Sequence, residues 1–365
     1  MSDFVFMARA LELAERGRGH VEPNPLVGAI VVRDGTIVGE GWHEKFGQPH
    51  AEIHALRLAG ENARDSILYV TLEPCCHFGK TPPCTEAVIR AGVRRVVFAM
   101  LDPFHQVSGQ GASRLREAGI DVEVGVGEIA ARRLNAPYLK RLRSNRPWVH
   151  AKWAMTLDGK IATRSGESKW ITGEAARAKV HELRGRMDAI VVGKGTLLAD
   201  NPLLTARPRG PRLATRVVLT ATGEGMPNDC QLLKTITDAP VLVITGEQAV
   251  SRLNSWQDLG ATVIAVPILE TGLDLKSALT KLGEIGMTNI LVEGGGGTLG
   301  RFLEFREIDE VHAFLAPMVV GGTTALGPFS GMGIGRLCDA LRLSDRRVEE
   351  LGEDIYIHGM ARGSE

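Results

Sequence analysis

The chain has 365 residues, which is too long for one ordinary hydrophobic core and fits two domains of roughly 100–200 residues each. Lys and Arg together number 43, as do Asp and Glu, so the formal net charge is zero and nucleic acid is disfavoured as a partner. An apolar fraction of 44% argues against disorder. No apolar run approaches the roughly 20 residues that cross a bilayer, and no secretory signal is visible. We therefore expect a cytoplasmic protein without membrane association.

Helices and short apolar strands alternate through the first half of the chain. Phe6, Ala10, Leu13 and Ala14 share one face of a first helix, which stops near Gly17. The expected elements that follow are strands at 26–33 and 36–41, a helix at 50–59, a strand at 66–72, a helix at 85–91, a strand at 93–100 and a helix at 128–143. This alternation predicts an α/β layer fold.

The segment Ser144-Asn145-Arg146-Pro147 is short and polar, and its proline ends the preceding helix. We therefore expect it to be the linker between the two halves. We place one domain at 1–145 and a second at 146–365. Strands are expected in the second half at 148–154, 189–192, 216–219, 241–245, 262–266, 289–293 and 311–320. Helices between most of them indicate a second, larger α/β domain.

Histidine, glutamate and cysteine form the sharpest pattern in the first half: His50-Ala51-Glu52, then Pro74-Cys75, then Cys84. One imidazole and two thiolates suit Zn²⁺, and three protein ligands leave a position open for water, as in catalytic sites. The order H-x-E, P-C, C is that of zinc deaminases, although eight residues separate Cys75 from Cys84 instead of two. Cys76 and His77 compete as ligands, but Cys76 would point away from a metal held by its neighbour.

Glu52 lies two residues after His50, in a helix that opens after Pro49. At a first turn both side chains can lean over the same point, so Glu52 would stand beside the metal without binding it. We expect Glu52 to be the catalytic proton shuttle. Cys84 opens the next helix, whose dipole favours a thiolate.

The segment 73–84 resembles the long zinc loop of the bifunctional deaminase/reductases of riboflavin biosynthesis. This resemblance implies a cytidine-deaminase-like three-layer domain in which His50, Cys75 and Cys84 bind zinc. The segments 23–28 and 102–111 are similar to the family's substrate loops. By the same resemblance, the pyrimidine or phosphoribosyl site is formed by Asn24, His43, Lys80 and Asp102.

Two glycine-rich turns follow strands in the second half, at 193–195 and 294–300. Glycines allow the backbone to approach a pyrophosphate. The match of Gly295, Gly297 and Gly300 to G-x-G-x-x-G is weak, because no acidic residue ends a strand about 20 positions later. A standard dinucleotide-binding fold is therefore rejected.

The segments 152–162, 165–172 and 195–202 are similar to reductases related to dihydrofolate reductase, and they match the second half of the same bifunctional family. The resemblance implies a dihydrofolate-reductase-like domain. It implies cofactor contacts from Ala154, Trp170, Thr172, Thr196, Asp200, Gly295, Gly296, Gly297, Thr298, Leu299, Gly300 and Arg301. It implies substrate contacts from Lys152, Ser168, Arg184, Leu204, Arg207 and Glu293, of which the two guanidinium groups suit a phosphate.

The cofactor is expected to be NADPH, with NADH as an alternative. Related proteins often carry an arginine after the strand at 217–219 that pairs with a 2′-phosphate. Here the segment 220–225 contains Glu224 and no arginine.

The resemblance implies a bifunctional enzyme that binds a small-molecule substrate, and we expect the chain to form a homo-oligomer. It deaminates 2,5-diamino-6-(5-phosphoribosylamino)pyrimidin-4-one with zinc and then reduces the ribosyl chain to ribityl with a nicotinamide hydride. Two alternatives are an RNA adenosine deaminase with an appended domain and a zinc-stapled interaction protein. The absence of a basic stripe argues against the first, and the second requires Cys76 or His77 as a fourth ligand.

Overall fold

The structure, a computed structural model, describes residues 2–76, 82–104 and 108–363. The chain divides between Arg143 and Ser144 into two compact units, called unit 1 and unit 2 below. Within the described ranges, no helix has both the length and the apolar character needed to cross a membrane.

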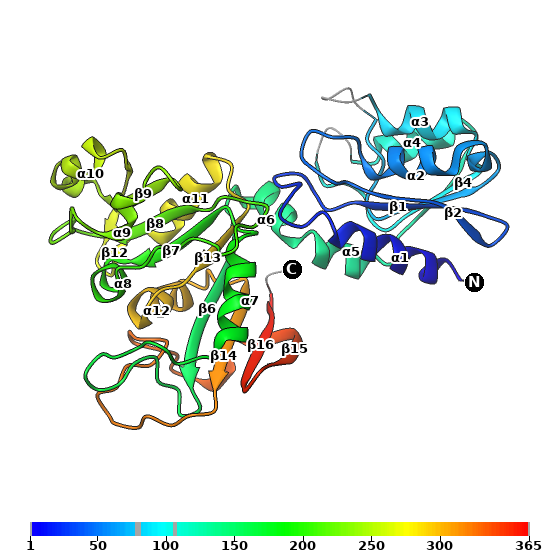
Figure 1. The fold of residues 1–365 in the computed structure, drawn as a ribbon. Helices are drawn as coiled ribbons and strands as arrows, with labels where there is room; N and C mark the ends of the chain where they lie inside the picture. The colour runs from blue at the N-terminus through cyan, green and yellow to red at the C-terminus, as the bar shows by residue number, and fades with distance from the viewer. Residues whose placement is uncertain (1, 77–81, 105–107, 364–365) are drawn as a thin grey trace. The chain divides into compact units, whose positions relative to one another are not determined.

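Unit 1 is a sheet covered by helices on both faces (Figure 1). Its sheet has the strand order β2-β1-β3-β4-β5, in which β3, β4 and β5 run parallel and β1 pairs antiparallel with both of its neighbours. The elements are α1 (Asp3–Glu15), β1 (Gly28–Arg33), β2 (Thr36–Trp42), α2 (Ala51–Ala59), η1 (Gly60–Ala63), β3 (Ile67–Val70), α3 (Cys84–Ala91), β4 (Arg95–Phe98), α4 (Gln110–Glu117), β5 (Asp121–Val124), α5 (Glu128–Leu134) and α6 (Ala136–Ser144).

Alternation along the strands of unit 1 creates two apolar layers, one on each face of the sheet. On one face, Val31 and Leu68 pack in a cluster with residues of α2, α3 and α4. On the other, Ile30 and Tyr69 pack in a cluster with residues of α1, α5 and α6. The three-layer arrangement expected from the sequence is confirmed, and the apolar face expected for the first helix is buried.

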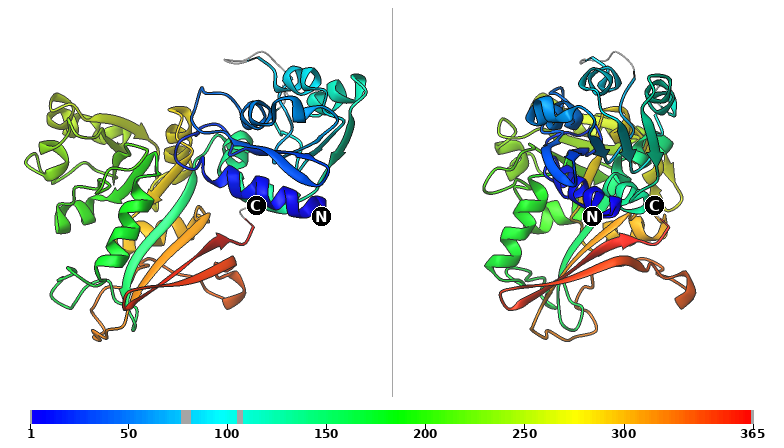
Figure 2. Two further views of the ribbon diagram at one scale, coloured as in Figure 1. Left: turned by 45° about the vertical axis from the view of Figure 1, so that its right-hand side comes forward. Right: turned by 90° about the vertical axis from the view of Figure 1, so that its right-hand side faces the viewer.

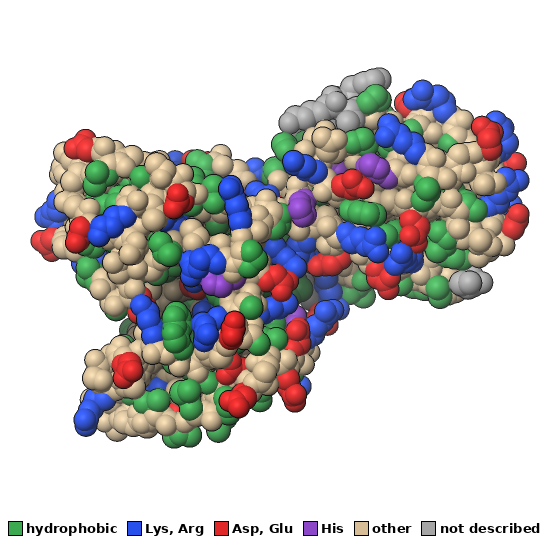
Figure 3. Space-filling model, viewed as in Figure 1, with side chains coloured by type: hydrophobic (Ala, Val, Ile, Leu, Met, Phe, Trp, Pro, Cys, Tyr) green, Lys and Arg blue, Asp and Glu red, His purple; other side chains and the backbone are tan. Residues whose placement is uncertain are grey.

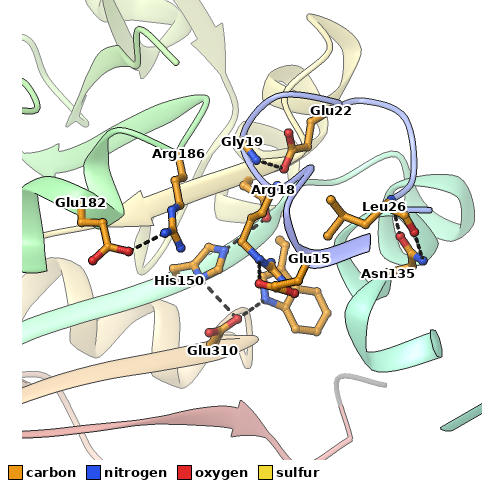
Figure 4. Close-up of polar contacts among 12 residues, drawn as sticks. Glu15, Arg18, Gly19, Glu22, Leu26, Asn135, His150, Glu182, Arg186 and Glu310 are labelled. Carbon is orange, nitrogen blue, oxygen red and sulfur yellow. Dashed lines mark hydrogen bonds and ion pairs between the residues drawn. The ribbon is translucent and has the colours of Figure 1, made fainter. Parts of the chain in front are cut away.

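The helix expected at 128–143 is two helices, because Asn135 interrupts it. The Asn135 side chain is buried, and its Oδ1 accepts a hydrogen bond from the Leu26 backbone N–H at 2.8 Å (Figure 4). Its Nδ2 donates to the Leu26 carbonyl at 3.0 Å. Asn135 therefore fixes the loop before β1, which contains Asn24.

Unit 2 contains a larger, mostly parallel sheet with the strand order β10-β9-β8-β7-β13-β6-β14-β16-β15. Its elements are β6 (Trp148–Thr156), α7 (Glu174–Arg184), β7 (Ala189–Gly193), α8 (Lys194–Asp200), β8 (Thr215–Thr220), α9 (Gln231–Lys234), β9 (Val241–Gly246), η2 (Glu247–Leu253), α10 (Asn254–Asp258), β10 (Thr262–Val266), β11 (Ile268–Leu269), β12 (Gly272–Leu273), α11 (Leu275–Glu284), β13 (Asn289–Val292), α12 (Gly296–Glu304), β14 (Glu310–Ala316), η3 (Leu337–Asp339), β15 (Leu343–Leu351) and β16 (Asp354–Ala361).

The sheet of unit 2 is also covered on both faces. Residues of α11 and α12 pack in one cluster with Val191 and Ile290. Residues of α7, α9 and α10 pack in the other with Ile190 and Leu291. The inner strands β7, β9 and β13 are buried on both faces, and this explains why they are nearly continuous apolar runs in the sequence.

Several elements differ from the sequence expectations. The strand expected at 311–320 ends at Ala316. The antiparallel pair β15 and β16, which lies beside β14 at the edge of the sheet (Figure 2), was not expected. Most of β15 is exposed and polar, so it lacks the apolar alternation that reveals a strand. In unit 1, α4 and β5 were also not expected, because both carry few apolar residues.

Lys and Arg side chains are interspersed with Asp and Glu over the face in view in Figure 3. This intermixing agrees with the zero net charge of the chain.

The first prediction concerns Asn135. Replacing it with alanine leaves the buried N–H and C=O of Leu26 without partners, so Asn135→Ala should destabilise unit 1 by about 2–4 kcal/mol. Urea denaturation followed by circular dichroism measures the change. Asn62→Ala at an exposed position is the control, and equal stability of the two variants would contradict this role of Asn135.

Candidate functional site

Unit 1 contains a cavity of about 410 Å³, formed by the loops at one end of its sheet. The loops that follow β2, β3 and β4 contribute to it, together with the loop before β1 and α6. Its lining residues include Asn24, His43, His50, Glu52, Glu73, Cys75, Asp102, Phe104, Tyr138 and Arg141. The His50–Glu52 and Cys75 regions, distant in sequence, thus meet in one cavity.

The candidate ligand atoms of His50, Cys75 and Cys84 lie within 4.8 Å of one another. Nδ1 of His50 lies 3.2 Å from Sγ of Cys84 and 3.6 Å from Sγ of Cys75. A tetrahedral zinc ion with bonds of about 2.0–2.3 Å separates its ligand atoms by roughly 3.3–3.8 Å. The three side chains therefore have the spacing and the donor chemistry of a zinc site.

Two helix N-termini position these ligands. His50 is the N-cap of α2, and Cys84 is the first residue of α3. The backbone N–H of Cys84 donates to Sγ of Cys75 at 3.3 Å, so the start of α3 also orients the second thiol. Both expectations, His50 before a first turn and Cys84 opening a helix, are confirmed.

The hydrogen bonds among these side chains change the pKa values of His50 and Cys75 in opposite directions. A hydrogen bond with Cys75 raises the pKa of His50 to about 9. Hydrogen bonds from Cys84 and His50 lower the pKa of Cys75 to about 4. Cys75 therefore favours the thiolate, the form of cysteine that binds metals, whereas the hydrogen bond with Cys75 raises the pKa of Cys84.

Glu52 lies in the first turn of α2 beside this group. Its side chain is buried, and its Oε2 has no hydrogen-bond partner among the described residues. Burial raises the pKa of the Glu52 carboxyl group. A buried carboxyl oxygen without a partner is costly, and a polar ligand in the cavity would satisfy it.

Asn24, His43 and Asp102 also line this cavity. Burial lowers the pKa of His43, so its ring is neutral near pH 7. Its Nδ1 lies 3.2 Å from the Pro49 carbonyl and its Nε2 lies 3.4 Å from Nδ2 of Asn24. The neutral ring therefore donates to the carbonyl and accepts from the amide, which orients Asn24. Lys80, the remaining expected contact, lies outside the described residues.

Glu73 has a role that the sequence did not reveal. Its buried carboxylate accepts backbone N–H groups from Asp102, Gly109 and Ala112 at 3.0–3.2 Å. Glu73 therefore holds the loop after β4 against the segment that carries Cys75. The glutamate directly before Pro74-Cys75 was the only available signal.

Tyr138 was also missed. Its hydroxyl donates to Oδ1 of Asp102 at 3.0 Å, and the same oxygen accepts the Phe104 N–H at 2.9 Å. The structure therefore orients the Asp102 carboxylate from α6 and from its own loop.

Cys76 is not part of the ligand group. Its Sγ lies 3.9 Å from Oε1 of Gln110, and its side chain is partly exposed. His77, the other competing ligand, lies outside the described residues. Among the described residues, the group offers three ligands and no fourth.

Unit 2 contains a cavity of about 570 Å³ at the carboxyl ends of β7 and β13. The expected cofactor contacts that line it are Thr196, Asp200, Gly295, Gly296, Gly297, Thr298 and Arg301. A Cβ atom at Gly297 would meet no atom within 4 Å, so this backbone faces open space. Oγ1 of Thr196 accepts the Gly295 N–H at 3.0 Å, which joins the two glycine-rich turns.

The other expected cofactor contacts are not among the lining residues of this cavity. Leu299 is buried in the hydrophobic core, and Gly300 packs directly against the Ser330 carbonyl. Trp170 is 69% exposed and stacks with the Arg177 guanidinium at 4.9 Å. Ala154 and Thr172 are also absent from the lining.

Three of the expected substrate contacts form one ionic group. Arg184 donates to both oxygens of Glu293 at 2.6 and 2.8 Å, and Nζ of Lys152 lies 3.6 Å from Oε2. Burial acts to raise the pKa of Glu293, but the two cations outweigh it and lower that pKa to about 2. Burial lowers the pKa of Lys152.

The remaining expected substrate contacts are dispersed. Ser168 lines the large cavity and donates to Oδ1 of Asp200 at 3.2 Å. Leu204 is buried in the core. Arg207 donates to Oγ1 of Thr205 at 3.1 Å.

Comparison with protein families assigns a description to each unit. Residues 1–100 match the cytidine and deoxycytidylate deaminase zinc-binding region. Residues 147–357 match the RibD C-terminal domain.

Whole proteins resemble the chain along nearly its full length. The riboflavin biosynthesis protein RibD of Aquifex aeolicus is 43% identical over 353 residues, which are 96% of each chain. The protein of the same name from Escherichia coli is 39% identical and covers 98% of this chain and 99% of its own.

Two solved structures are also similar to the chain along nearly its full length. Acinetobacter baumannii RibD has a TM-score of 0.85 at 37% identity, with 98% of each chain covered. A Thermotoga maritima diaminohydroxyphosphoribosylaminopyrimidine deaminase/5-amino-6-(5-phosphoribosylamino)uracil reductase has a TM-score of 0.82 at 36% identity, with the same coverage.

The second prediction concerns the metal ligands. Cys84→Ser removes a thiolate from the ligand group, so this variant should lose zinc and deaminase activity. Cys76→Ser is the matched control and should keep both. Metal analysis by mass spectrometry measures the zinc content, and zinc loss in the Cys76 variant alone would reverse the assignment.

Proposed function

This chain belongs to the RibD family of riboflavin biosynthesis proteins, and we propose that each unit catalyses one of two consecutive reactions. Unit 1 deaminates 2,5-diamino-6-(5-phosphoribosylamino)pyrimidin-4-one by hydrolysis. Unit 2 then reduces the ribosyl chain of the product to ribityl. The observation that carries the proposal is the zinc-ligand group beside buried Glu52, in a chain that also contains the family's reductase domain.

In unit 1, His50, Cys75 and Cys84 would hold zinc beside the cavity that His50 and Cys75 line. Bound zinc would supply a Lewis acid that lowers the pKa of a water molecule toward neutrality. Cys75 already favours its thiolate form, whereas His50 and Cys84 would release their protons when the ion binds.

Glu52 would move the protons of the hydrolysis. Its raised pKa allows the carboxyl group to take a proton from water and to hold it within a buried site. One proton of the water can then pass to a nitrogen of the pyrimidine ring, and the other to the departing amino group, which leaves as ammonia. Asn24, which His43 orients, and Asp102, which Tyr138 orients, would bind the substrate from the cavity wall. Lys80 is proposed as a further contact from its sequence alone.

In unit 2, the glycine-lined cavity would hold the cofactor, which supplies a hydride. The start of α12 lines this cavity and is open beside Gly297, so a pyrophosphate would approach the backbone there. The Lys152–Glu293–Arg184 group would position the substrate, with Glu293 kept ionised by the two cations.

NADPH is the proposed cofactor, and two cations near the turn after β8 support this choice. Arg252 donates to the Thr222 carbonyl at 3.0 Å and lies 3.8 Å from the Glu224 carboxylate. Nζ of Lys194 donates to the Glu224 carbonyl at 3.1 Å. The segment 220–225 itself contains no arginine, but the fold brings cations to it from η2 and α8.

The third prediction concerns Glu52. Glu52→Gln keeps the shape of the side chain but cannot shuttle protons, so deamination should fall by about 10²–10⁴-fold while zinc is retained. Ammonia release and metal content are measured on the same preparation. The reduction of pre-deaminated substrate is the internal control and should be unchanged. A parallel loss of zinc would make Glu52 a ligand instead.

The fourth prediction concerns cofactor choice. Arg252→Ala removes a cation that would pair with the 2′-phosphate, so kcat/KM for NADPH should fall about five- to ten-fold while kcat/KM for NADH is unchanged. Lys281→Ala, at a cation that pairs with Glu284 on α11, is the control. Equal losses with both cofactors would argue against 2′-phosphate recognition by Arg252.

A further inference from the structure

A second group of metal-binding side chains lies in unit 2, away from the cavity lined by the glycine-rich turns. His150 is in β6, and Glu310 and His312 are in the neighbouring parallel strand β14. The register places Glu310 opposite His150 and His312 opposite Lys152. Since residues at intervals of two share a face of a strand, all three side chains lie on one face of the sheet. Figure 4 shows His150 and Glu310 pointing toward each other.

The distances within this group are those of metal ligands. Nδ1 of His150 lies 3.1 Å from Nε2 of His312. The Glu310 oxygens lie 3.4 Å from the first nitrogen and 3.5 Å from the second. A tetrahedral ion with bonds of about 2.0–2.1 Å separates its ligand atoms by roughly 3.3–3.4 Å. One ion can therefore contact all three side chains without a change of backbone.

The outer hydrogen bonds of both rings also fit a metal site. Nε2 of His150 lies 3.2 Å from Oδ1 of Asn289, an acceptor, so this nitrogen carries the proton and Nδ1 presents its lone pair to the group. Nδ1 of His312 lies 2.7 Å from the Tyr356 hydroxyl oxygen, which can accept a hydrogen bond from the ring N–H. Histidine ligands usually donate their second ring N–H in this way.

The carboxylate is positioned as well. The Trp148 indole N–H donates to Oε2 of Glu310 at 3.2 Å. The two histidine side chains are buried, whereas the Glu310 side chain is 24% exposed, which leaves a path for an ion to enter. Within the described residues, only this group and the one at His50, Cys75 and Cys84 bring three such ligand atoms within 4.8 Å.

We propose that His150, Glu310 and His312 bind a zinc ion in unit 2, separate from the zinc of the deaminase site. Two imidazoles and one carboxylate suit Zn²⁺ and leave one coordination position for water. The ion joins β6 to β14 close to Lys152. This lysine follows His150 by two residues and lies on the same face of the sheet. Bound zinc thereby stabilises the central strands that carry the reductase site.

The test uses the full-length chain carrying Cys75→Ser and Cys84→Ser, in which the first site is removed. After equilibration with micromolar free Zn²⁺ and gel filtration, this parent should retain about one zinc ion per chain and should gain thermal stability. Adding His312→Asn should abolish retention. Adding Glu310→Gln, a milder change at a partly exposed position, should weaken zinc affinity by at least about ten-fold.

His358→Asn is the matched control in the same background. His358 stacks near His312 at 6.2 Å between ring centroids, but its Nε2 is bonded to Glu349, so zinc retention should be unchanged. Circular dichroism establishes that each variant is folded, and Glu310→Gln decides the question if His312→Asn is not. Absence of zinc from the parent, or undiminished zinc affinity in the Glu310 variant, would overturn the proposal.

Discussion

The convergence of two helix N-termini on the end of β3 is the constraint on which the chemistry of unit 1 depends. The start of α2 presents His50 and Glu52, the start of α3 presents Cys84, and the segment after β3 presents Cys75. Both helices pack in the same apolar layer on one face of the sheet, which fixes where they begin. A metal-binding group and a buried acid therefore meet at one cavity. The Glu73 carboxylate then binds the loop after β4 and completes the cavity wall.

In unit 2, as in unit 1, the site lies at the ends of neighbouring strands, but different side chains form it. Its cavity lies where β7 and β13 end, and both strands continue there into glycine-rich turns. Glu293, directly after β13, gathers Arg184 and Lys152 around one buried carboxylate. In both units, therefore, a buried glutamate beyond a strand end organises the site: Glu73 through backbone N–H groups and Glu293 through two cations.

The sequence predicted those site residues whose type and order along the chain are fixed by the reaction. His50, Glu52, Cys75 and Cys84 meet that condition, and the structure brings them together. Glu73 was not readable, because its partners are backbone groups about 30–40 residues away and leave no pattern in side-chain type. The strand β15 was missed because an exposed edge strand needs no apolar alternation. The glycine run 294–300 combines two roles: Gly297 faces the cavity, whereas Gly300 permits close packing against Ser330.

The most direct measurement of the central claim is mass spectrometry of the products that the full-length chain forms from the diaminopyrimidine substrate, with and without NADPH. Without NADPH, the account predicts release of ammonia and accumulation of a compound in which one amino group is replaced by oxygen. With NADPH, this compound should be replaced by its dihydro form, the ribityl product. Oxidation of NADPH without prior ammonia release, or an unchanged substrate under both conditions, would contradict the assignment of one reaction to each unit.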